Sequence, residues 1–419
     1  MGHMPPSPIF APYNQYGCAR AAATPEASSD TVLGLERTLP LTGVQLEQLK
    51  ILDREPMSMK TNVAEYSLGG TPVKLEEILH IWSAQLYCTR VKLGTPPKEY
   101  TLHFDTGSDL VWVSCTPCTT AESGYYVSDT LYFDKFVGQK RVTSSASIFF
   151  GYSFQCSNSQ SYQFQTDGII GFGQNAISAI SQLNSQGVSS KVFSHCLRGL
   201  KDGSKDGGGI LVVGEVMWTG LVFTLILPSE DHYNVNMKGI AVNGKNISLD
   251  SSWLTTSNAQ GTIVDSGTTL VYLADGVYDP VITAINDAAH TGSINSFIMN
   301  GSQCYHKNIR LFYEQLNPSC PSKCQLFNKL LFYFSISNVS LFPTVTLYFD
   351  GGASMTTGPK DYLVPMFHYD GLQDKDPMLC IGFQPSKGPD NFFQHTTILG
   401  DIVLRDMIFM YNLETKQIG

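Results

Sequence analysis

Two short segments of the chain carry an aspartate followed by small hydroxyl residues and a glycine. The first is Asp105-Thr-Gly-Ser within LHFDTGSDLVWV, and the second is Asp265-Ser-Gly-Thr within GTIVDSGTTLVYL. Each aspartate ends an apolar run, so its carboxyl group should lie in or beside a core, where an unpaired charge is costly. One copy of this pattern would be ordinary turn chemistry, but two copies in one chain need a shared explanation.

A pair of carboxyl groups offers that explanation. Two carboxyl groups within hydrogen-bonding distance of one another share one proton, because the two negative charges would repel one another if both groups ionised. Such a pair can deprotonate a water while it protonates the carbonyl oxygen under attack, so it needs no metal and no cofactor. Backbone amides beside the glycines, and hydroxyl groups next to them, can hold the carboxyl groups in place. The residues expected to do so are Thr106, Gly107, Ser108, Ser266, Gly267 and Thr268.

A second element repeats after each aspartate segment. Asp167-Gly-Ile-Ile-Gly171 follows the first aspartate, and Thr397-Ile-Leu-Gly400 follows the second. From residue 87 onward, short runs rich in β-branched and aromatic residues alternate with Gly, Pro, Asn or Asp. This pattern predicts a mainly β structure with few short helices, near residues 176–183 and 277–289.

These segments resemble the pepsin-like aspartic proteases, and among them the plant type that includes the nepenthesins and the aspartic proteinase-like proteins. The resemblance rests on LYCTRVKLGTPPKEYTLHFDTGSDLVWVSC, DGIIGFGQ, GTIVDSGTTLVYL and TTILGDIVLRD, and it covers most of residues 86–419. It implies a mainly β, bilobal pepsin-like acid protease fold with a few short helices and the active site in the cleft between the lobes. It also implies an aspartic-type endopeptidase that acts at acidic pH.

The resemblance assigns roles residue by residue. Asp105 and Asp265 would be the catalytic pair. Ser108 and Thr268 would hydrogen-bond their carboxyl groups, and the small hydroxyl residue directly after each aspartate would interlock the lobes. Trp112 matches the tryptophan that supports the flap, the hairpin that covers the cleft of these enzymes.

The resemblance also divides the chain. Residues 1–85 are interpreted as a leader and pro-region, partly disordered, in which a segment from residue 35 to 56 carries a partial helical stripe. Residues 86–230 would form the N-terminal catalytic lobe, and residues 231–419 the C-terminal lobe. The first 30 residues contain no apolar segment typical of a signal peptide.

The two halves differ in length. Gly171 follows Asp105 by 66 residues, whereas Gly400 follows Asp265 by 135. The family has its flap directly before the segment SGYYVSDT, and the flap region is predicted to be missing here.

The second half has an atypical insertion at about 306–341. Our hypothesis is a skipped exon in the first half and a translated intron in the second. Two alternatives to an active protease therefore stay open: a catalytically weak or inactive pepsin-like binding or inhibitor protein, and a mis-spliced gene model.

Cysteines and sequons indicate the secretory pathway. The chain has 10 cysteines at wide spacings, which is typical of disulfides formed in an oxidising compartment. The resemblance pairs Cys304 with Cys380 and Cys156 with Cys196. We expect an extracellular or vacuolar glycoprotein made as a zymogen. The candidate glycosylation sites are Asn246, Asn300 and Asn338.

Composition and charge exclude other classes. The net charge of −9 and the absence of runs of Lys or Arg argue against nucleic acid as a partner. No stretch has the length and apolarity of a transmembrane segment, and no histidine or cysteine spacing is typical of a metal site. We expect a monomer that acts on polypeptide substrates without metal or cofactor.

Overall fold

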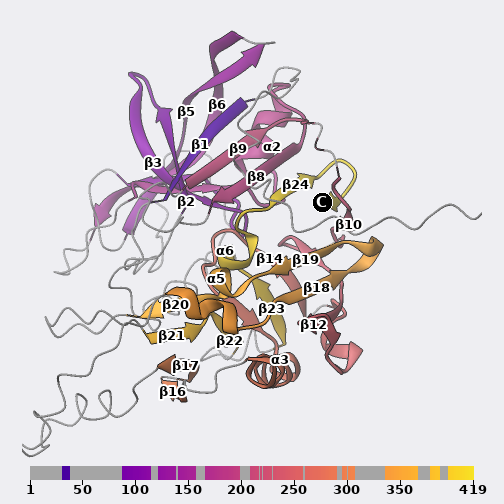
Figure 1. Cartoon of the computed structure of the whole chain (residues 1–419). Coiled ribbons are helices and arrows are strands. Elements are labelled where there is room, and N and C mark those ends of the chain that lie inside the picture. Colours follow the sequence, from indigo (N-terminus) through magenta and orange to yellow (C-terminus); the bar gives the residue numbers. More distant parts are fainter. Residues whose placement is uncertain are drawn as a thin grey trace, which may run out of the picture.

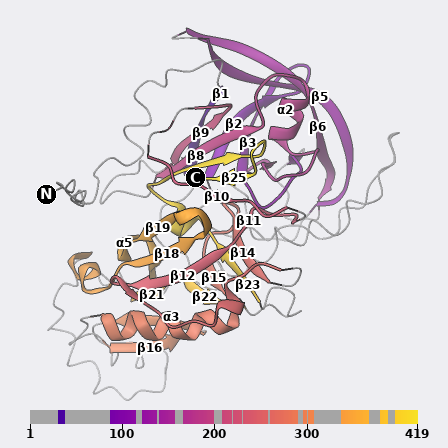
Figure 2. The ribbon, with the colours of Figure 1, turned by 90° about the vertical axis from the view of Figure 1, so that its right-hand side faces the viewer.

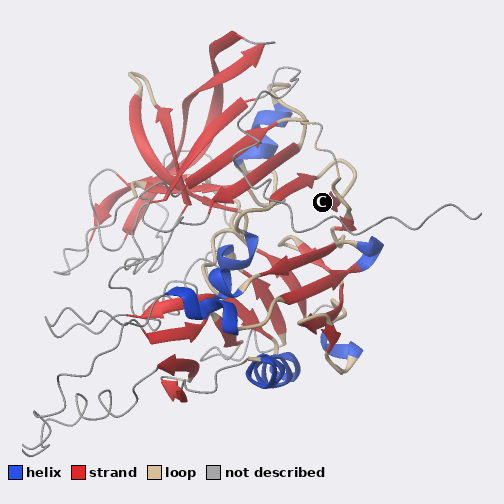
Figure 3. Cartoon of the chain, viewed as in Figure 1, coloured by secondary structure: helices blue, strands red, loops and turns tan. Residues whose placement is uncertain are grey.

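The computed structural model describes residues 31–37, 87–114, 121–137, 140–156, 166–198, 208–216, 218, 220–228, 230–257, 260–289, 295–299, 301–306, 336–366, 378–386 and 395–419. The structure has two lobes, and both consist mainly of strands (Figure 3). The predicted mainly β, bilobal fold with few short helices is confirmed. The predictions made for Asn300, and for most of the leader and of the insertion, lie outside the described residues.

One large sheet organises the N-terminal lobe. Its strands are β1 (Thr31–Arg37), β2 (Tyr87–Leu93), β3 (Lys98–Asp105), β4 (Trp112–Ser114), β5 (Ala121–Val137), β6 (Lys140–Cys156), β7 (Gly168–Gly171), β8 (Val192–Arg198), β9 (Gly208–Val213), β10 (Thr224–Leu225), β24 (Ile408–Asn412) and β25 (Gln417–Ile418). Their order in this 12-stranded sheet is β10-β25-β24-β8-β9-β1-β2-β3-β7-β4-β6-β5. Strands β5 and β6 form a long hairpin at one edge (Figure 1).

Strand β1 lies within residues 1–85, which the sequence analysis interprets as a leader and pro-region. It lies between β2 and β9 and pairs antiparallel with both. Residues 31–37 are thus part of the sheet of the N-terminal lobe. The strand also includes residues 35–37, the beginning of the stretch interpreted as a helical pre-domain segment, which here is extended backbone.

The end of the chain returns to the same sheet. Strand β24 pairs with β8, and β25 pairs with β10, so the last strands of the chain lie beside strands of the N-terminal lobe (Figure 1, yellow). The resemblance places residues 408–418 in the C-terminal lobe. Their backbone hydrogen bonds therefore join the two lobes through one continuous sheet.

Three smaller sheets build the C-terminal lobe. Their strands are β11 (Asn234–Val235), β12 (Met237–Val242), β13 (Lys245–Asn246), β14 (Gly261–Val264), β15 (Val271–Leu273), β16 (Asn295–Met299), β17 (Ser302–His306), β18 (Val345–Phe349), β19 (Ser354–Thr357), β20 (Leu363–Met366), β21 (Met378–Ile381), β22 (Phe383–Pro385) and β23 (Thr396–Leu399). The sheet orders are β11-β14-β23-β15-β22, β13-β12-β18-β19 and β16-β17-β21-β20.

The helices are short, apart from one. They are α2 (Ala179–Ser185), η2 (Ser251–Trp253), α3 (Asp275–Ala288), η4 (Ile336–Leu341), η5 (Asp350–Gly352), α5 (Pro359–Tyr362) and α6 (Asp401–Leu404). The longest, α3, lies at the end of the C-terminal lobe that is remote from the large sheet (Figure 2). Helices α2 and α3 correspond to the two helices that the sequence predicted, with α2 starting later because Ser178 accepts the backbone N–H of Ser181 at 3.4 Å and so caps it.

Each aspartate segment follows a strand that pairs in parallel with a second strand. Strand β3 ends at Asp105 and pairs in parallel with β7, so that Asp105 lies opposite Gly171. Strand β14, which leads to Asp265, pairs in parallel with β23 in the same way. A Cβ atom at Gly171 would lie 2.5 Å from the carbonyl oxygen of Asp109, which explains why a glycine is needed there.

We predict that Gly171→Ala destabilises the N-terminal lobe, because the added methyl group meets backbone that cannot move aside. Overpacking of this kind costs about 1–3 kcal/mol. Urea unfolding of the full chain would measure the free energy of unfolding.

The matched control is Gly239→Ala, since a Cβ atom there has no neighbour within 4 Å and the backbone is not left-handed. Equal stability of Gly171→Ala and the control would contradict this explanation.

Candidate active site

Asp105 lies at the end of β3, and its side chain is fully buried. Oδ1 accepts the backbone N–H of Gly107 at 2.7 Å, and Oδ2 accepts the hydroxyl group of Ser108. Both donors come from the turn that directly follows the aspartate. The turn thus supplies the hydrogen bonds that a buried carboxyl group requires.

Asp265 repeats this arrangement in the other lobe. Its carboxyl group is fully buried, Oδ1 accepts the backbone N–H of Gly267 at 2.9 Å, and Oδ2 accepts the hydroxyl group of Thr268 at 2.8 Å. The backbone N–H of Asp265 donates to Leu399 in β23 at 3.0 Å. The same pair of donors, one backbone N–H and one hydroxyl group, therefore binds each aspartate.

The two turns are joined by reciprocal hydrogen bonds. The backbone N–H of Thr106 donates to Oγ of Ser266 at 3.1 Å, and the backbone N–H of Ser266 donates to Oγ1 of Thr106 at 2.9 Å. The Ser266 hydroxyl group also donates to the carbonyl oxygen of Phe104 at 3.3 Å. Residues 160 positions apart in sequence are therefore held together, as the predicted interlock between the lobes requires.

Each carboxyl group lies against the glycine of the other turn. A Cβ atom at Gly107 would lie 2.5 Å from the oxygens of Asp265, and one at Gly267 would meet the carboxyl group of Asp105. Because Gly107 and Gly267 also donate to the aspartates of their own turns, Asp105 and Asp265 face one another across the pair of glycines. The structure brings together all eight residues that the sequence assigned to the dyad and its support.

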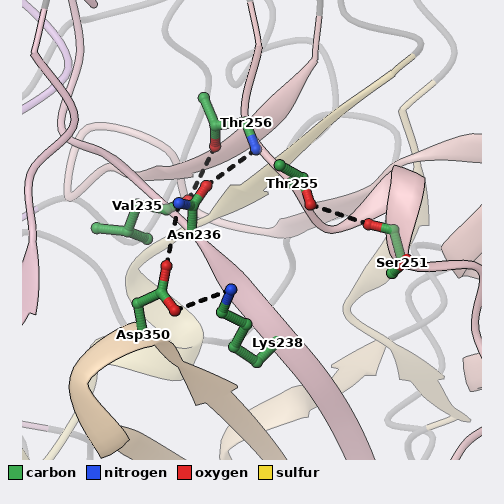
Figure 4. Close-up of polar contacts among 7 residues, drawn as sticks. All are labelled: Val235, Asn236, Lys238, Ser251, Thr255, Thr256 and Asp350. Carbon is green, nitrogen blue, oxygen red and sulfur yellow. Dashed lines mark hydrogen bonds and ion pairs between the residues drawn. The ribbon is translucent and has the colours of Figure 1, made fainter.

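A polar network supports the strand that leads to Asp265 (Figure 4). Strand β11 pairs with β14, and Thr256 anchors β11 because its Oγ1 donates to the carbonyl oxygen of Val235 at 3.0 Å. The Thr256 backbone N–H donates to Asn236 Oδ1 at 3.0 Å, and Asn236 Nδ2 donates to Asp350 Oδ2 at 3.1 Å. Lys238 pairs with Asp350 at 2.9 Å. These contacts tie β14 to the sheet that contains β12 and β18.

Trp112 lies in β4 and is 7% exposed. Its Nε1 has no hydrogen-bond partner among the residues that the structure describes. Only residues 115–120 separate β4 from β5, and they lie outside those residues. The assignment of Trp112 as flap support, and the prediction that the flap is missing, both stay predictions.

His103 is a neighbour of the site that sequence reasoning did not assign to it, because no metal-ligand spacing includes it. It is 3% exposed, and burial lowers its pKa to about 4, while the Asp265 carboxyl group opposes this shift. The signal in the sequence was its position two residues before Asp105. Alternate residues of a strand share a face, so His103 lies on the face of β3 that carries the aspartate.

The structure confirms one of the two predicted disulfides, and it describes the side chain of one of the three candidate glycosylation sites. The Cys304–Cys380 disulfide is confirmed, and the two residues lie opposite one another in β17 and β21. Cys196 is disulfide-bonded, but its pairing with Cys156 stays a prediction. Asn246 is exposed in β13, as a glycosylation site must be. The side chain of Asn338 lies outside the described residues.

The described part of the chain contains no group of three or more His, Cys, Asp or Glu side chains able to hold a metal ion. None of its helices has the length and apolarity needed to cross a membrane.

Comparison with known proteins identifies the family. A profile described as eukaryotic aspartyl protease matches residues 119–419. The chain belongs to this family. It is 30% identical to aspartic proteinase 36 of Arabidopsis thaliana over 80% of this chain and 73% of that protein. The family and its relatives make the chain an aspartic endopeptidase of the plant type, as the sequence predicted.

Further relatives in the same family support this conclusion. Aspartic proteinase 39 of Arabidopsis thaliana is 27% identical over 89% of this chain and 80% of that protein. Aspartic proteinase nepenthesin-1 of Nepenthes gracilis is 23% identical over 88% of this chain and 85% of that protein. A second profile, described as xylanase inhibitor N-terminal, matches residues 87–126 of this aspartyl protease.

We predict that His103→Leu makes the protein less sensitive to acid. The unfolded chain binds a proton at His103 near the ordinary histidine pKa of 6.5, whereas burial lowers the pKa in the folded chain to about 4. The stability due to neutral His103 is therefore complete above pH 6.5 and is lost as the pH falls toward 4. The loss amounts to about 3 kcal/mol and should be absent from the variant.

Urea unfolding at neutral and at acidic pH would measure this difference. The control is His395→Leu, at an exposed histidine, which should keep the pH dependence of the unmodified protein. An equal loss of stability in His103→Leu and in the unmodified protein would show that His103 does not cause it.

Proposed function

We propose that Asp105 and Asp265 are the catalytic pair of this endopeptidase and that they activate the attacking water together. The observation that carries the proposal is the matched binding of the two carboxyl groups. Each accepts one backbone N–H and one hydroxyl group from its own turn, and each lies against the glycine of the other turn. Two buried carboxyl groups arranged in this way share one proton, a behaviour for which aspartic proteases are the standard example.

The reaction follows from the shared proton. The ionised aspartate takes a proton from water as the water oxygen bonds to the peptide carbonyl carbon, and the protonated aspartate gives its proton to the carbonyl oxygen. The aspartate that took the water proton then gives it to the peptide nitrogen, and the other aspartate takes a proton from a diol hydroxyl group as the carbon–nitrogen bond breaks, so the pair returns to its starting state. The products are a carboxylic acid and an amine, and no covalent enzyme intermediate forms.

Burial and fixed hydrogen bonds support this role for the pair. Because Gly107, Ser108, Gly267 and Thr268 already hold the carboxyl groups, the site does not need to reorganise when the charge moves during the reaction. We propose extended peptides with apolar residues around the scissile bond as substrates, and a monomer as the acting species.

We also propose that the protein acts in the secretory pathway, outside the cell or in a vacuole. The Cys304–Cys380 disulfide supports an oxidising compartment, and the exposed sequon at Asn246 is compatible with glycosylation there. A second candidate function is binding or inhibition of another protein by a catalytically weak chain. The match of residues 87–126 to the xylanase inhibitor profile favours this candidate.

We predict that Asp105→Asn and Asp265→Asn each lower kcat/KM for peptide cleavage at acidic pH by roughly 100- to 10,000-fold, because each removes one member of the acid–base pair. The assay uses the purified full chain, with and without a statine-type inhibitor. Asp129→Asn is the control, since the Asp129 side chain bonds Thr95, outside the two aspartate turns.

Cleavage that survives either substitution at the aspartate pair would refute the proposed dyad. A chain that does not cleave peptides but binds a xylanase tightly would favour the second candidate function.

A further inference from the structure

A buried cluster of rings lies next to the aspartate turns. Strands β8 and β24 pair so that Tyr411 lies opposite Phe193 and Phe409 lies opposite His195. Residues opposite one another in paired strands share a face, as do alternate residues of each strand, so all four rings lie on one face. The ring of Phe104, the residue directly before Asp105, packs against this face with its centroid 5.5 Å from that of His195.

A chain of polar contacts runs from this cluster to the junction of the two turns. Nε2 of His195 lies 3.2 Å from the hydroxyl oxygen of Tyr411. The side chain of Thr106 is a polar neighbour of the Tyr411 hydroxyl group, and this contact favours the ionised form of Tyr411 and so opposes the rise of its pKa. Oγ1 of Thr106 in turn accepts the backbone N–H of Ser266 at 2.9 Å. His195, Tyr411 and Thr106 are each at most 1% exposed, so water does not compete for these bonds.

We propose that His195 and Tyr411 are positioning residues of the active site: they orient the Thr106 hydroxyl group and thereby fix the spacing of the two carboxyl groups. The proposal rests on the proposed role of Asp105 and Asp265. It extends that role to a strand at the end of the chain that contributes no residue to the dyad.

The ring packing makes Tyr411 a rigid support. Its ring stacks on Phe193 with centroids 4.5 Å apart and planes inclined by 6°. His195 stacks on Phe409 with centroids 5.4 Å apart. A hydroxyl group can rotate freely unless its partners fix it, and Thr106 gains two fixed partners in this arrangement, the Tyr411 oxygen and the Ser266 amide.

The imidazole of His195 is costly to bury. Its Nδ1 is buried without a hydrogen-bond partner in the described part of the chain, and such an atom costs about 1–3 kcal/mol. An aliphatic or phenyl side chain would fill the space without that cost. A role for Nε2 as the partner of Tyr411 gives a reason for the imidazole.

This chain of polar contacts can persist at the pH at which a carboxyl pair works. Burial lowers the pKa of His195 to about 3 and raises the pKa of Tyr411, so both side chains stay neutral in mildly acidic solution. The groups that face His195 are the rings of Phe104 from β3 and of Phe409 and Tyr411 from β24, none of which is charged. The charge of the Asp265 carboxyl group, in the C-terminal lobe, also raises the pKa of Tyr411.

The test compares Tyr411→Phe with Tyr362→Phe in the full chain. Both tyrosines are fully buried, but the Tyr362 hydroxyl group donates to the carbonyl oxygen of Pro343 at 2.7 Å, away from the aspartate turns. The first readout is hydrogen exchange of the backbone amides of Thr106 and Ser266. We expect exchange to become roughly fivefold to tenfold faster in Tyr411→Phe, because the reciprocal bonds loosen, and to stay unchanged in Tyr362→Phe.

The second readout is the pH profile of peptide cleavage. Looser turns let the carboxyl groups separate, so their two apparent pKa values move closer together. In Tyr411→Phe the alkaline limb of the profile should move to lower pH and kcat should fall while KM is unchanged, and Tyr362→Phe should keep the original profile. His195→Phe should behave as Tyr411→Phe does, and it provides a second variant if Tyr411→Phe does not fold.

The two readouts separate the two proposals. Equal amide exchange in Tyr411→Phe, Tyr362→Phe and the unmodified chain would overturn the positioning role, even if the chain cleaves peptides. Absence of cleavage by the unmodified chain would overturn the proposed function, and hydrogen exchange would still decide whether His195 and Tyr411 fix the turns.

Discussion

The reciprocal hydrogen bonds between Thr106 and Ser266 are the constraint on which the site depends. They join two turns that lie 160 residues apart in sequence, and each turn binds its own buried carboxyl group. Without this junction, two carboxyl groups that repel one another when ionised would have no reason to stay close. Gly107 and Gly267 have no Cβ atom, and each therefore leaves room for the carboxyl group of the opposite lobe.

The rest of the fold brings the two turns together. In the N-terminal lobe, β3 ends at Asp105 and pairs in parallel with β7, which ends at Gly171. In the C-terminal lobe, β14 and β23 pair in parallel directly before Asp265 and Gly400. Each glycine lets the backbone of the neighbouring turn pass closely. The lobes are then joined a second time, since β24 and β25 pair with strands of the large sheet. That second join places Tyr411 beside Thr106, so the end of the chain contributes to the geometry of a site formed far earlier in the sequence.

Sequence alone predicted the parts of the site that are local. The turn chemistry of Asp105-Thr-Gly-Ser and its repeat specified the donors to each carboxyl group, because these donors lie within three residues of each aspartate. Sequence could not predict the pairing of β24 with β8, or the insertion of β1 between β2 and β9, because these contacts join distant segments and depend on the whole fold. For the same reason it missed the roles of His103, His195 and Tyr411.

A titration of the aspartate side-chain carboxyl carbons by ¹³C NMR would show whether the two lobes hold one coupled pair of carboxyl groups. We expect the signals of Asp105 and Asp265 to change together in two well-separated steps, one below and one above the ordinary pKa of an aspartate. In Asp265→Asn the Asp105 signal should change in a single step. Independent titration of both residues in a single step near the ordinary pKa would show that the two carboxyl groups are not coupled.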